Sequence, residues 1–275
     1  MSEISRCMSH LLWLGTHALD IGASGPFFYA TAEREKLLEL YEMTGGQRMM
    51  TSYIRVGGVK EDTPAGFDRA VRAWADGFTP VVDMLAGLLT ANPIWKQRTQ
   101  NIGFLDQASV ISYGLMGPIM RAVGIKQDIR KDEPYCRYDE FDFEVPVFTE
   151  GDVYARYQVR LEEMRQSRNI ILQGLEKLHY TEPGTHMWIS DHFAPPPRRD
   201  INADIEGLIH HFKYWTEGFK PPAGEAYACI ESGKGELGFY VVSDGSAKPI
   251  RVKVRGASFC NLAALPAMCE GQMIA

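Results

Sequence analysis

A lone carboxylate near the end of an apolar helix is the first feature of this sequence that could do chemistry. Asp20 ends a helix whose apolar face includes Leu11, Leu14 and Leu19, and Thr16 and His17 lie one helical turn before it. A helix dipole favours negative charge at the opposite end of a helix. Since no Lys or Arg lies within four residues, Asp20 needs a histidine or hydroxyl partner, or it will hold its proton tightly. Spacing alone leaves two readings open: a functional carboxylate, or one that braces the following loop.

Other patterns that could bind a metal or a phosphate are weaker signals. Glu206 and His210 are four apart on a predicted helix and could share a metal, but no third ligand is visible. The segment 233–235 is glycine-rich, yet it lies between two predicted strands, which favours a hairpin connection over a phosphate cradle. The cysteines form no Cys-x-x-Cys pair, so we expect reduced, mostly buried thiols and no metal held by this chain. They are Cys7, Cys136, Cys229, Cys260 and Cys269.

Composition excludes several classes of function. The 275 residues are 45% hydrophobic and 23% charged, as in ordinary globular proteins. The net charge is -6 and no basic run is present, so a nucleic-acid partner is not expected. No signal peptide is visible at the start, and no apolar segment is long enough to span a bilayer. If a membrane matters, we expect this chain to lie beside it.

The elements that must position these residues are mostly helices. Apolar residues at helical spacing predict helices over residues 2–21, 27–43, 64–88, 154–178 and 201–215. The third begins at Thr63 and Pro64, a favourable helix start, and is expected to bend at Pro80. Arg168 interrupts the apolar stripe of the fourth, either reaching the surface or pairing with a buried carboxylate. Residues 179–199, with three consecutive prolines, predict a linker or surface loop.

Strand patterns gather near the end of the sequence. Residues 226–230, 237–242 and 250–254 alternate apolar and polar side chains, with a turn signal at Asp244 and Gly245. Short extended segments are also predicted at 53–56 and 141–147. We therefore expect an α+β, mainly α-helical fold in one domain, residues 1–275. A helical core, 1–220, precedes a small antiparallel β-rich segment, 221–275. Both ends of the sequence look cut.

Separated blocks, which keep one order and spacing along the chain, resemble one family. The sequence resembles the D subunit of bacterial respiratory complex I, the 49-kDa-type quinone-site subunit of NADH:quinone oxidoreductase. The blocks are SHLL (9–12), THALDIGA (16–23), PFFY (26–29), ERE (33–35), YIRVGGV (53–59), DIRK (128–131), FEVP (143–146), HHFK (210–213), TEG (216–218), KGELG (234–238) and VSDG (242–245).

The resemblance implies a fold, a reaction and a set of partners. The fold would be related to the large subunit of nickel-iron hydrogenases, with the metal lost and the emptied cavity used for quinone. The protein would act in a proton-translocating complex that passes electrons from NADH to quinone through FMN and iron-sulfur clusters on other subunits. Its partners would be the iron-sulfur B-type subunit and the C, I and membrane H subunits. It would be peripheral, at the cytoplasmic face of a bacterial inner membrane or the matrix side of a mitochondrial one.

The resemblance also implies roles for five residues. Asp20 matches the aspartate that bonds a headgroup-binding histidine, and Thr16 and Phe28 match positions in the quinone cavity or channel. Arg55 matches an arginine near the partner's iron-sulfur cluster. Met50 stands where some relatives carry a histidine linked to that cluster's protonation, which methionine cannot reproduce.

Departures from the family pattern leave alternatives open. The headgroup-binding histidine and tyrosine come from a segment before the first helix here, and a closing helix would follow Ala275. This chain is therefore expected to be inactive in isolation, and the alternative function is a non-catalytic structural or assembly fragment of the complex. A hydrogenase-like metalloenzyme is a further rival, but the absence of cysteine pairs argues against it.

Overall fold

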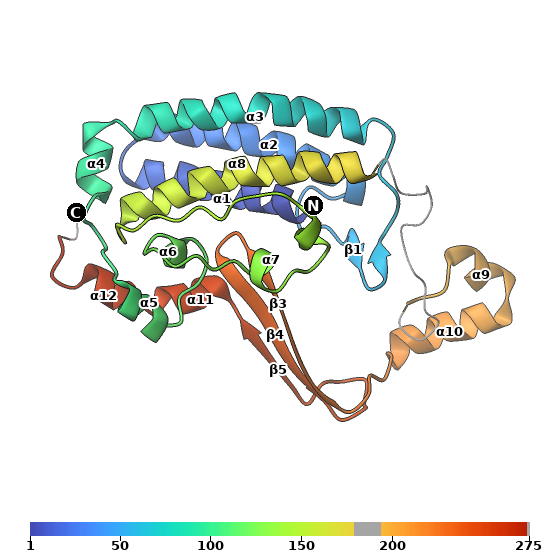
Figure 1. Ribbon diagram of the computed structural model, residues 1–275. Coiled ribbons are helices and arrows are strands. Elements are labelled where there is room, and N and C mark those ends of the chain that lie inside the picture. Colours follow the sequence, from blue (N-terminus) through green and yellow to red (C-terminus); the bar gives the residue numbers. More distant parts are fainter. Residues whose placement is uncertain (179–193, 274–275) are drawn as a thin grey trace.

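Four long helices enclose the main hydrophobic core (Figure 1). They are α1 (Ser2–Asp20), α2 (Ser24–Gly45), α3 (Phe67–Leu89) and α8 (Val153–Leu178). The computed structural model describes residues 1–178 and 194–273. Apolar stripes on these helices face one another, and such tertiary burial provides most of a helix's stability. The predicted mainly helical α+β fold is confirmed, whereas its division into segments 1–220 and 221–275 stays a prediction.

Shorter elements connect the long helices and complete the fold. They are α4 (Pro93–Thr99), α5 (Gln107–Ser112), α6 (Pro118–Arg121), α7 (Ile129–Asp132), η1 (Tyr138–Glu140), α11 (Ala257–Leu262), α12 (Leu265–Cys269), and the two-residue strands β1 (Ile54–Arg55) and β2 (Gly58–Val59). Strands β1 and β2 pair antiparallel, which confirms the extended segment predicted at residues 53–56.

Helix α3 carries the predicted apolar stripe but begins later than predicted. Phe67 and Phe78 are buried in the core, as the stripe requires. Thr63 is not the helix cap, so that prediction is wrong. The backbone turns after Thr63, with the Phe67 amide donating to the Pro64 carbonyl at 3.1 Å. Gly66 then precedes the helix at a φ of 88°, a left-handed conformation that favours glycine.

The prediction of a strand at residues 141–147 is wrong. This segment is irregular and runs beside α8. Its backbone bonds to side chains of that helix, since the Asp142 amide donates to Gln173 at 2.8 Å and the Glu144 amide to Gln166 at 3.1 Å. Its alternating apolar side chains pack on η1 and α8. The alternation therefore reflects one buried face of an extended segment that lies on a helix.

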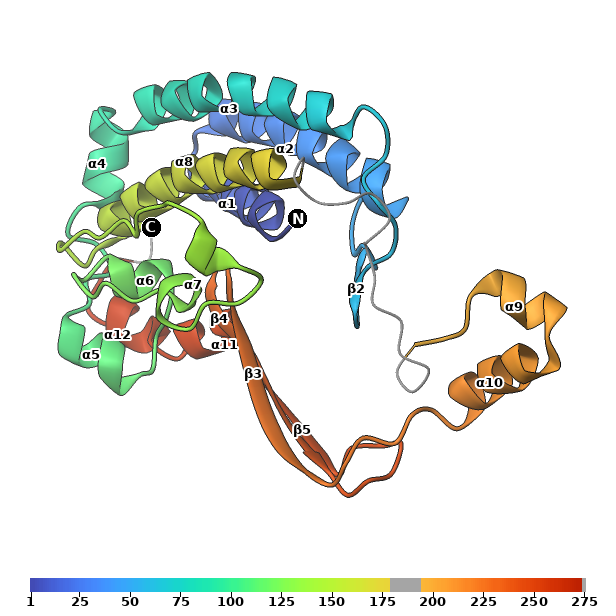
Figure 2. The ribbon, with the colours of Figure 1, turned by 45° about the vertical axis from the view of Figure 1, so that its right-hand side comes forward.

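A three-stranded antiparallel sheet leads away from the helical body (Figure 2). It comprises β3 (Gly224–Ser232), β4 (Gly235–Ser243) and β5 (Arg251–Arg255), which confirms the three predicted strands. The turn between β3 and β4 confirms the predicted hairpin. Gly235 in this turn and Gly117, which precedes α6, both have positive φ. A Cβ on Gly117 would lie 2.5 Å from the Gly235 Cα. Glycine therefore lets the hairpin tip approach the start of α6.

The helix predicted at residues 201–215 is two helices. They are α9 (Arg198–Ala203) and α10 (Ile205–Thr216). Asp204 separates them, because its extended backbone and its side chain, which accepts from the Gly207 amide at 3.2 Å, begin a new helix. The linker predicted at 179–199 falls mostly on residues 179–193, outside the described part.

Arg168 was expected either to reach the surface or to pair with a buried carboxylate, and the structure shows a third arrangement. Its Nε donates to the Ala75 carbonyl of α3 at 3.1 Å, and its Nη1 donates to Asn169 at 3.2 Å. The side chain remains half-buried. It therefore joins α8 to the backbone of α3, with no carboxylate partner among the residues that the structure describes.

The cap of α4 yields a stability prediction. Asn92 accepts hydrogen bonds from the Ile94 and Trp95 amides at 2.9 and 3.4 Å, and so positions the buried Trp95. Asn92→Ala should lower the free energy of unfolding by about 1 kcal/mol, because two amides lose their acceptor. Chemical denaturation measures this loss. Asn202→Ala, at an exposed position of α9, is the control and should not lower it by more than about 0.5 kcal/mol. Equal losses in both variants would contradict the assignment.

Candidate functional site

Three of the five predicted site residues lie at the same end of the α1–α2 hairpin. Thr16 and Asp20 lie on the last turns of α1, and Phe28 lies near the start of α2. All three side chains are exposed, Phe28 by 67%. Leu12 and Leu19 of α1 are exposed beside them. Exposed apolar side chains therefore lie beside the Asp20 carboxylate at this end of the hairpin.

The other two predicted residues lie at the opposite end of α2. Met50 is 92% exposed and has a φ of 54°, and Arg55 lies in β1, where its Nε donates to the Ser52 carbonyl at 3.1 Å. A helix of 22 residues is about 33 Å long. The structure therefore does not bring Met50 and Arg55 together with Asp20.

The neighbours of Asp20 do not satisfy its carboxylate. The Thr16 hydroxyl donates to the Leu12 and Trp13 carbonyls at 2.9 and 3.1 Å, within its own helix. In residues 1–178 and 194–273, no hydrogen bond or ion pair to the Asp20 side chain is present. Its charge does act on His17: burial and the Arg160 guanidinium lower the pKa of His17 to about 4, whereas Asp20 raises it.

The largest polar feature is one that the sequence patterns did not predict, a buried charge cluster beneath α1. Its members come from α1, α6, α7, α8, β3 and the residue before α7, and all are buried. We define the buried charge cluster as Glu3, Arg6, His10, Arg121, Asp128, Arg130, Glu163 and Glu231.

Arg121 is the centre of one half of this cluster. Its Nε donates to Glu163 at 2.8 Å, and its Nη1 and Nη2 each donate to Glu231 at 3.0 Å. The other Glu163 oxygen lies 2.7 Å from the His10 Nε2. Burial alone would raise the pKa of Glu163, but Arg121 and His10 hold it well below its usual range. An ionised Glu163 requires the His10 proton on Nε2, since that atom must donate.

Glu3 is the centre of the other half. Arg6 and Arg130 each lie 3.2 Å from its carboxylate, and the hydroxyls of Tyr138 and Ser167 donate to it at 2.5 and 2.6 Å. Burial by itself would raise the pKa of Glu3, but the two guanidinium groups lower it to about 2. Glu3 is therefore ionised and fully satisfied.

The four carboxylates of the cluster face its three guanidinium groups, and the buried Arg160 adds a fourth guanidinium whose charge acts on Glu163. Burial lowers the pKa of His10 to about 4, so this histidine is neutral. Burial raises the pKa of Glu231, with Arg121 lowering it only in part and Asp128 raising it further. Glu231 is therefore the member of the cluster best suited to hold a proton.

A signal for this cluster existed in the sequence. Glu3, Arg6 and His10 are three and four residues apart on an otherwise apolar helix, and Glu163 and Ser167 repeat that spacing on α8. Polar residues at these spacings share one helical face. Two such faces on neighbouring helices are compatible with a buried polar contact, although the sequence does not say which faces meet.

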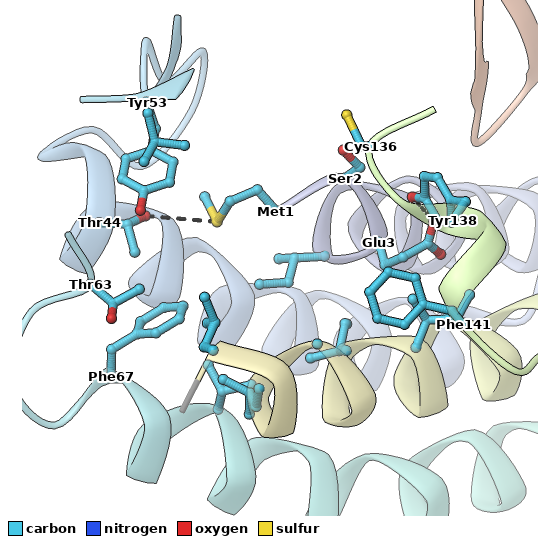
Figure 3. Close-up of a pocket in the computed structure, with 18 of the residues that line it drawn as sticks. Met1, Ser2, Glu3, Thr44, Tyr53, Thr63, Phe67, Cys136, Tyr138 and Phe141 are labelled. Carbon is cyan, nitrogen blue, oxygen red and sulfur yellow. Dashed lines mark hydrogen bonds between the residues drawn. The ribbon is translucent and has the colours of Figure 1, made fainter. Parts of the chain in front are cut away.

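A cavity of about 660 Å³ lies at the opposite end of α1 from Asp20. Figure 3 shows Met1, Thr44 and Tyr53 on one side of it and Tyr138 and Phe141 on the other. Most of its lining is apolar, and none of the five predicted site residues lines it. The cavity is therefore separate from the predicted quinone end.

No group of three or more His, Cys, Asp or Glu side chains in the described part could hold a metal ion. All five cysteines are free, but the expectation that most are buried is wrong. Only Cys7 is buried, whereas Cys136 and Cys269 are exposed, because they lie in a surface turn and at the end of α12. Within residues 1–178 and 194–273, no helix combines the length and apolar character needed to cross a bilayer.

Comparison with known proteins gives one consistent result. Residues 20–275 match the family described as "Respiratory-chain NADH dehydrogenase, 49 Kd subunit". The chain is 51% identical over 273 residues to a D-type subunit of the NADH-quinone oxidoreductase of Roseiflexus sp. (strain RS-1), covering 99% of this chain and 66% of that relative. It is 49% identical over 275 residues to a D-type subunit from Chloroflexus aurantiacus, covering 100% and 67%. With the D-type subunit of Geotalea uraniireducens it shares 47% over 275 residues, covering 100% and 70%. The chain thus spans about two thirds of the length of these relatives.

Proposed function

This chain belongs to the family of the 49 Kd subunit of respiratory-chain NADH dehydrogenase, and we propose that it is the quinone-binding peripheral-arm subunit of a proton-translocating NADH:quinone oxidoreductase. The curated relatives are named as D-type subunits of NADH-quinone oxidoreductase. The hydrogenase relationship of the fold, with the metal lost, belongs to the same proposal.

The observation that carries the proposal is the exposed end of the α1–α2 hairpin. There Thr16, Asp20 and Phe28 lie beside exposed apolar side chains, and the Asp20 carboxylate has no hydrogen-bond partner within the described residues. An apolar surface with one polar group to fix orientation is what a quinone ring requires. Its covering would come from the histidine- and tyrosine-bearing segment and from the partner subunit.

The proposed complex supplies the redox groups from other subunits. FMN and iron-sulfur clusters would carry electrons from NADH, and the B-type subunit would place the last cluster near the quinone. The C, I and membrane H subunits would complete the surroundings, at the cytoplasmic face of a bacterial inner membrane or the matrix side of a mitochondrial one. The resemblance gives Met50 and Arg55 a place near the cluster, but the length of α2 separates them from Asp20, so the structure does not support a cluster contact at these two residues beside the quinone.

Asp20 would act through the histidine that binds the quinone headgroup. Reduction of the quinone takes up protons, which the histidine and the tyrosine would donate as positioned acids. Asp20 would hold that histidine, and its charge would lose its partner or move when the histidine changes protonation. That electrostatic change would be relayed toward the pump.

The test is Asp20→Asn in an assembled complex whose quinone-site subunit carries the family histidine and tyrosine. Turnover with a short-chain quinone analogue should fall by at least about tenfold, because a charged hydrogen-bond partner is lost. Complex content, measured by native gel electrophoresis, should not change. The control is Asp76→Asn, an exposed carboxylate on α3, with wild-type turnover. Unchanged turnover in Asp20→Asn would overturn the proposal and leave a structural or assembly role as the function.

A further inference from the structure

Arg160 of α8 is a buried cation whose guanidinium is only partly satisfied. The residue is 8% exposed, and its guanidinium lies over the Trp13 ring of α1, 4.3 Å from the centroid. Its Nη1 donates to the Arg156 carbonyl at 2.9 Å, whereas its Nε is buried and has no hydrogen-bond partner. Within residues 1–178 and 194–273, no carboxylate forms an ion pair with this side chain. Buried charges in proteins are nearly always paired, so the exception points to an anionic partner from outside the described residues.

The carboxylate next to Arg160 along α8 is already engaged. Glu163 lies one helical turn away, and its charge acts on Arg160. Its two oxygens, however, bond to Arg121 at 2.8 Å and to His10 at 2.7 Å. Burial is the main reason that the pKa of Arg160 falls to about 10, and the guanidinium groups of Arg156 and Arg121 act in the same direction. The free edge of Arg160 therefore lies in a cationic environment that lacks a direct counter-ion.

A second cation, Lys234, lies beside the same face of α1. The tip of the β3–β4 hairpin rests on Ser9, since a Cβ on Gly233 would lie 3.0 Å from the Ser9 Oγ. Trp13, which carries Arg160 on its ring, is the next residue along that helical face. The Lys234 ammonium has no hydrogen bond or ion pair with any residue that the structure describes. Burial and the charge of Arg160 lower the pKa of Lys234 to about 8, which agrees with two neighbouring cations.

The hairpin tip is fixed in place by side chains from two other elements. Asn261 of α11 donates from its Nδ2 to the Lys234 carbonyl at 3.1 Å, and its Oδ1 accepts from the Met116 amide at 3.3 Å. Arg6 of α1 donates to the Ser232 carbonyl at 3.0 Å. The backbone on both sides of the turn is therefore anchored, so Lys234 is held beside α1 before any ligand arrives.

A carboxylate group is the anion that fits these two cations. Guanidinium groups bond to carboxylates through the donors on their edge, and the Trp13 ring covers one face of Arg160, so a ligand must approach the edge that carries Nε. An ammonium adds charge without a strict geometry. A carboxylate carries a single charge and costs less to remove from water than a doubly charged phosphate, which matters beside a buried guanidinium.

We propose that Arg160 and Lys234 form a binding site for a carboxylate group, which accepts a hydrogen bond from the Arg160 Nε–H and pairs with the Lys234 ammonium. The carboxylate belongs either to a side chain of a neighbouring polypeptide or to a small organic acid. Asp20 does not supply it, because it lies two helical turns beyond Trp13, about 10 Å further along α1. The site is therefore separate from the quinone end, and it does not depend on the proposed function.

Acetate is the probe for the purified chain. At pH 7 and constant ionic strength, replacing chloride by acetate should shift the ¹⁵N–¹H resonance of the Arg160 Nε, with saturation at a Kd in the millimolar range, and should raise the thermal midpoint. Arg160→Met keeps an unbranched stem on the Trp13 ring but removes the charge, and should abolish the rise in midpoint. In chloride this variant should be at least as stable as wild type, because the charge that it removes has no partner there.

Two lysine variants make the test independent of the buried position. Lys234→Gln should weaken acetate binding by about fivefold, the effect of one unit charge at contact distance in a watery environment. Lys253→Gln, at an exposed position of β5, is the matched control and should bind acetate as wild type does. The inference is overturned if acetate has no saturable effect on wild type, or if Arg160→Met responds to acetate as strongly as wild type.

The assembled complex distinguishes the two sources of the carboxylate. If a side chain of a neighbouring polypeptide supplies it, Arg160→Met should reduce complex content on native gels, although the variant chain by itself remains folded. Wild-type complex content, together with acetate binding by the purified chain, identifies a small organic acid instead. Neither measurement uses turnover with quinone, so the carboxylate site and the quinone role of Asp20 can fail separately.

Discussion

Glu163→Gln is expected to lower the free energy of unfolding by about 3–5 kcal/mol, because it leaves the buried Arg121 guanidinium without its closest carboxylate. Glu163 is 1% exposed and pairs with Arg121 at 2.7 Å. Taking one partner from a buried ion pair costs far more than the pair contributes net, since the remaining charge has no water to replace the lost contact. Denaturant unfolding followed by circular dichroism measures the change.

The adjacent residue is the matched control for that variant. Glu162 forms an ion pair with Arg165 on the same helix, but its side chain is 42% exposed. Glu162→Gln should therefore change the free energy of unfolding by less than about 1 kcal/mol, because water screens and replaces this contact. A loss of similar size in the two variants would show that Glu163 does not occupy a buried charge cluster in solution.

Lowering the pH from 7 to 4.5 should destabilise the protein by several kcal/mol. Burial lowers the pKa of His10 and of His17 from 6.5 to about 4. Above pH 6.5 both are neutral in the folded and unfolded chain. Below it, the unfolded chain binds protons that the folded protein excludes, so stability is lost between pH 6.5 and about 4. Each histidine contributes about 3 kcal/mol, since a tenfold change in proton affinity equals about 1.4 kcal/mol.

Two acidic groups modify the profile at its lower end. The pKa of Glu3 is lowered to about 2, so its contribution is complete above 4.5 and is lost as the pH falls toward 2. Glu231 acts in the opposite direction, because burial raises its pKa and the folded protein holds that proton more firmly. Free energies of unfolding measured at several pH values test the profile, and His17→Phe should reduce the loss by about 3 kcal/mol. A flat profile from pH 7 to 4.5 contradicts neutral buried histidines.

Most of the helical framework followed from local patterns. The stripes on α1, α3 and α8 repeat at three and four residues, and burying such a stripe is favourable whatever covers it. The hairpin of β3 and β4 followed from alternation on either side of a glycine-rich turn. At residues 141–147 the alternation of apolar and polar side chains predicted a strand that is not there. An extended segment packed on a helix buries every second side chain, as a strand does.

The sequence by itself determined the family, through blocks whose order does not depend on the fold, and it identified Asp20 as a carboxylate without a nearby cation. Only the tertiary structure decided which charges share one interior. Glu3, Arg121, Glu163 and Glu231 are far apart along the chain, and each read alone is an ordinary surface residue. Charge pairing acts through space over a few ångströms, so it depends on which helical faces meet, and local patterns carry no such information. The same holds for His17, whose place between Trp13 and Trp95 comes from the packing of α4 against α1.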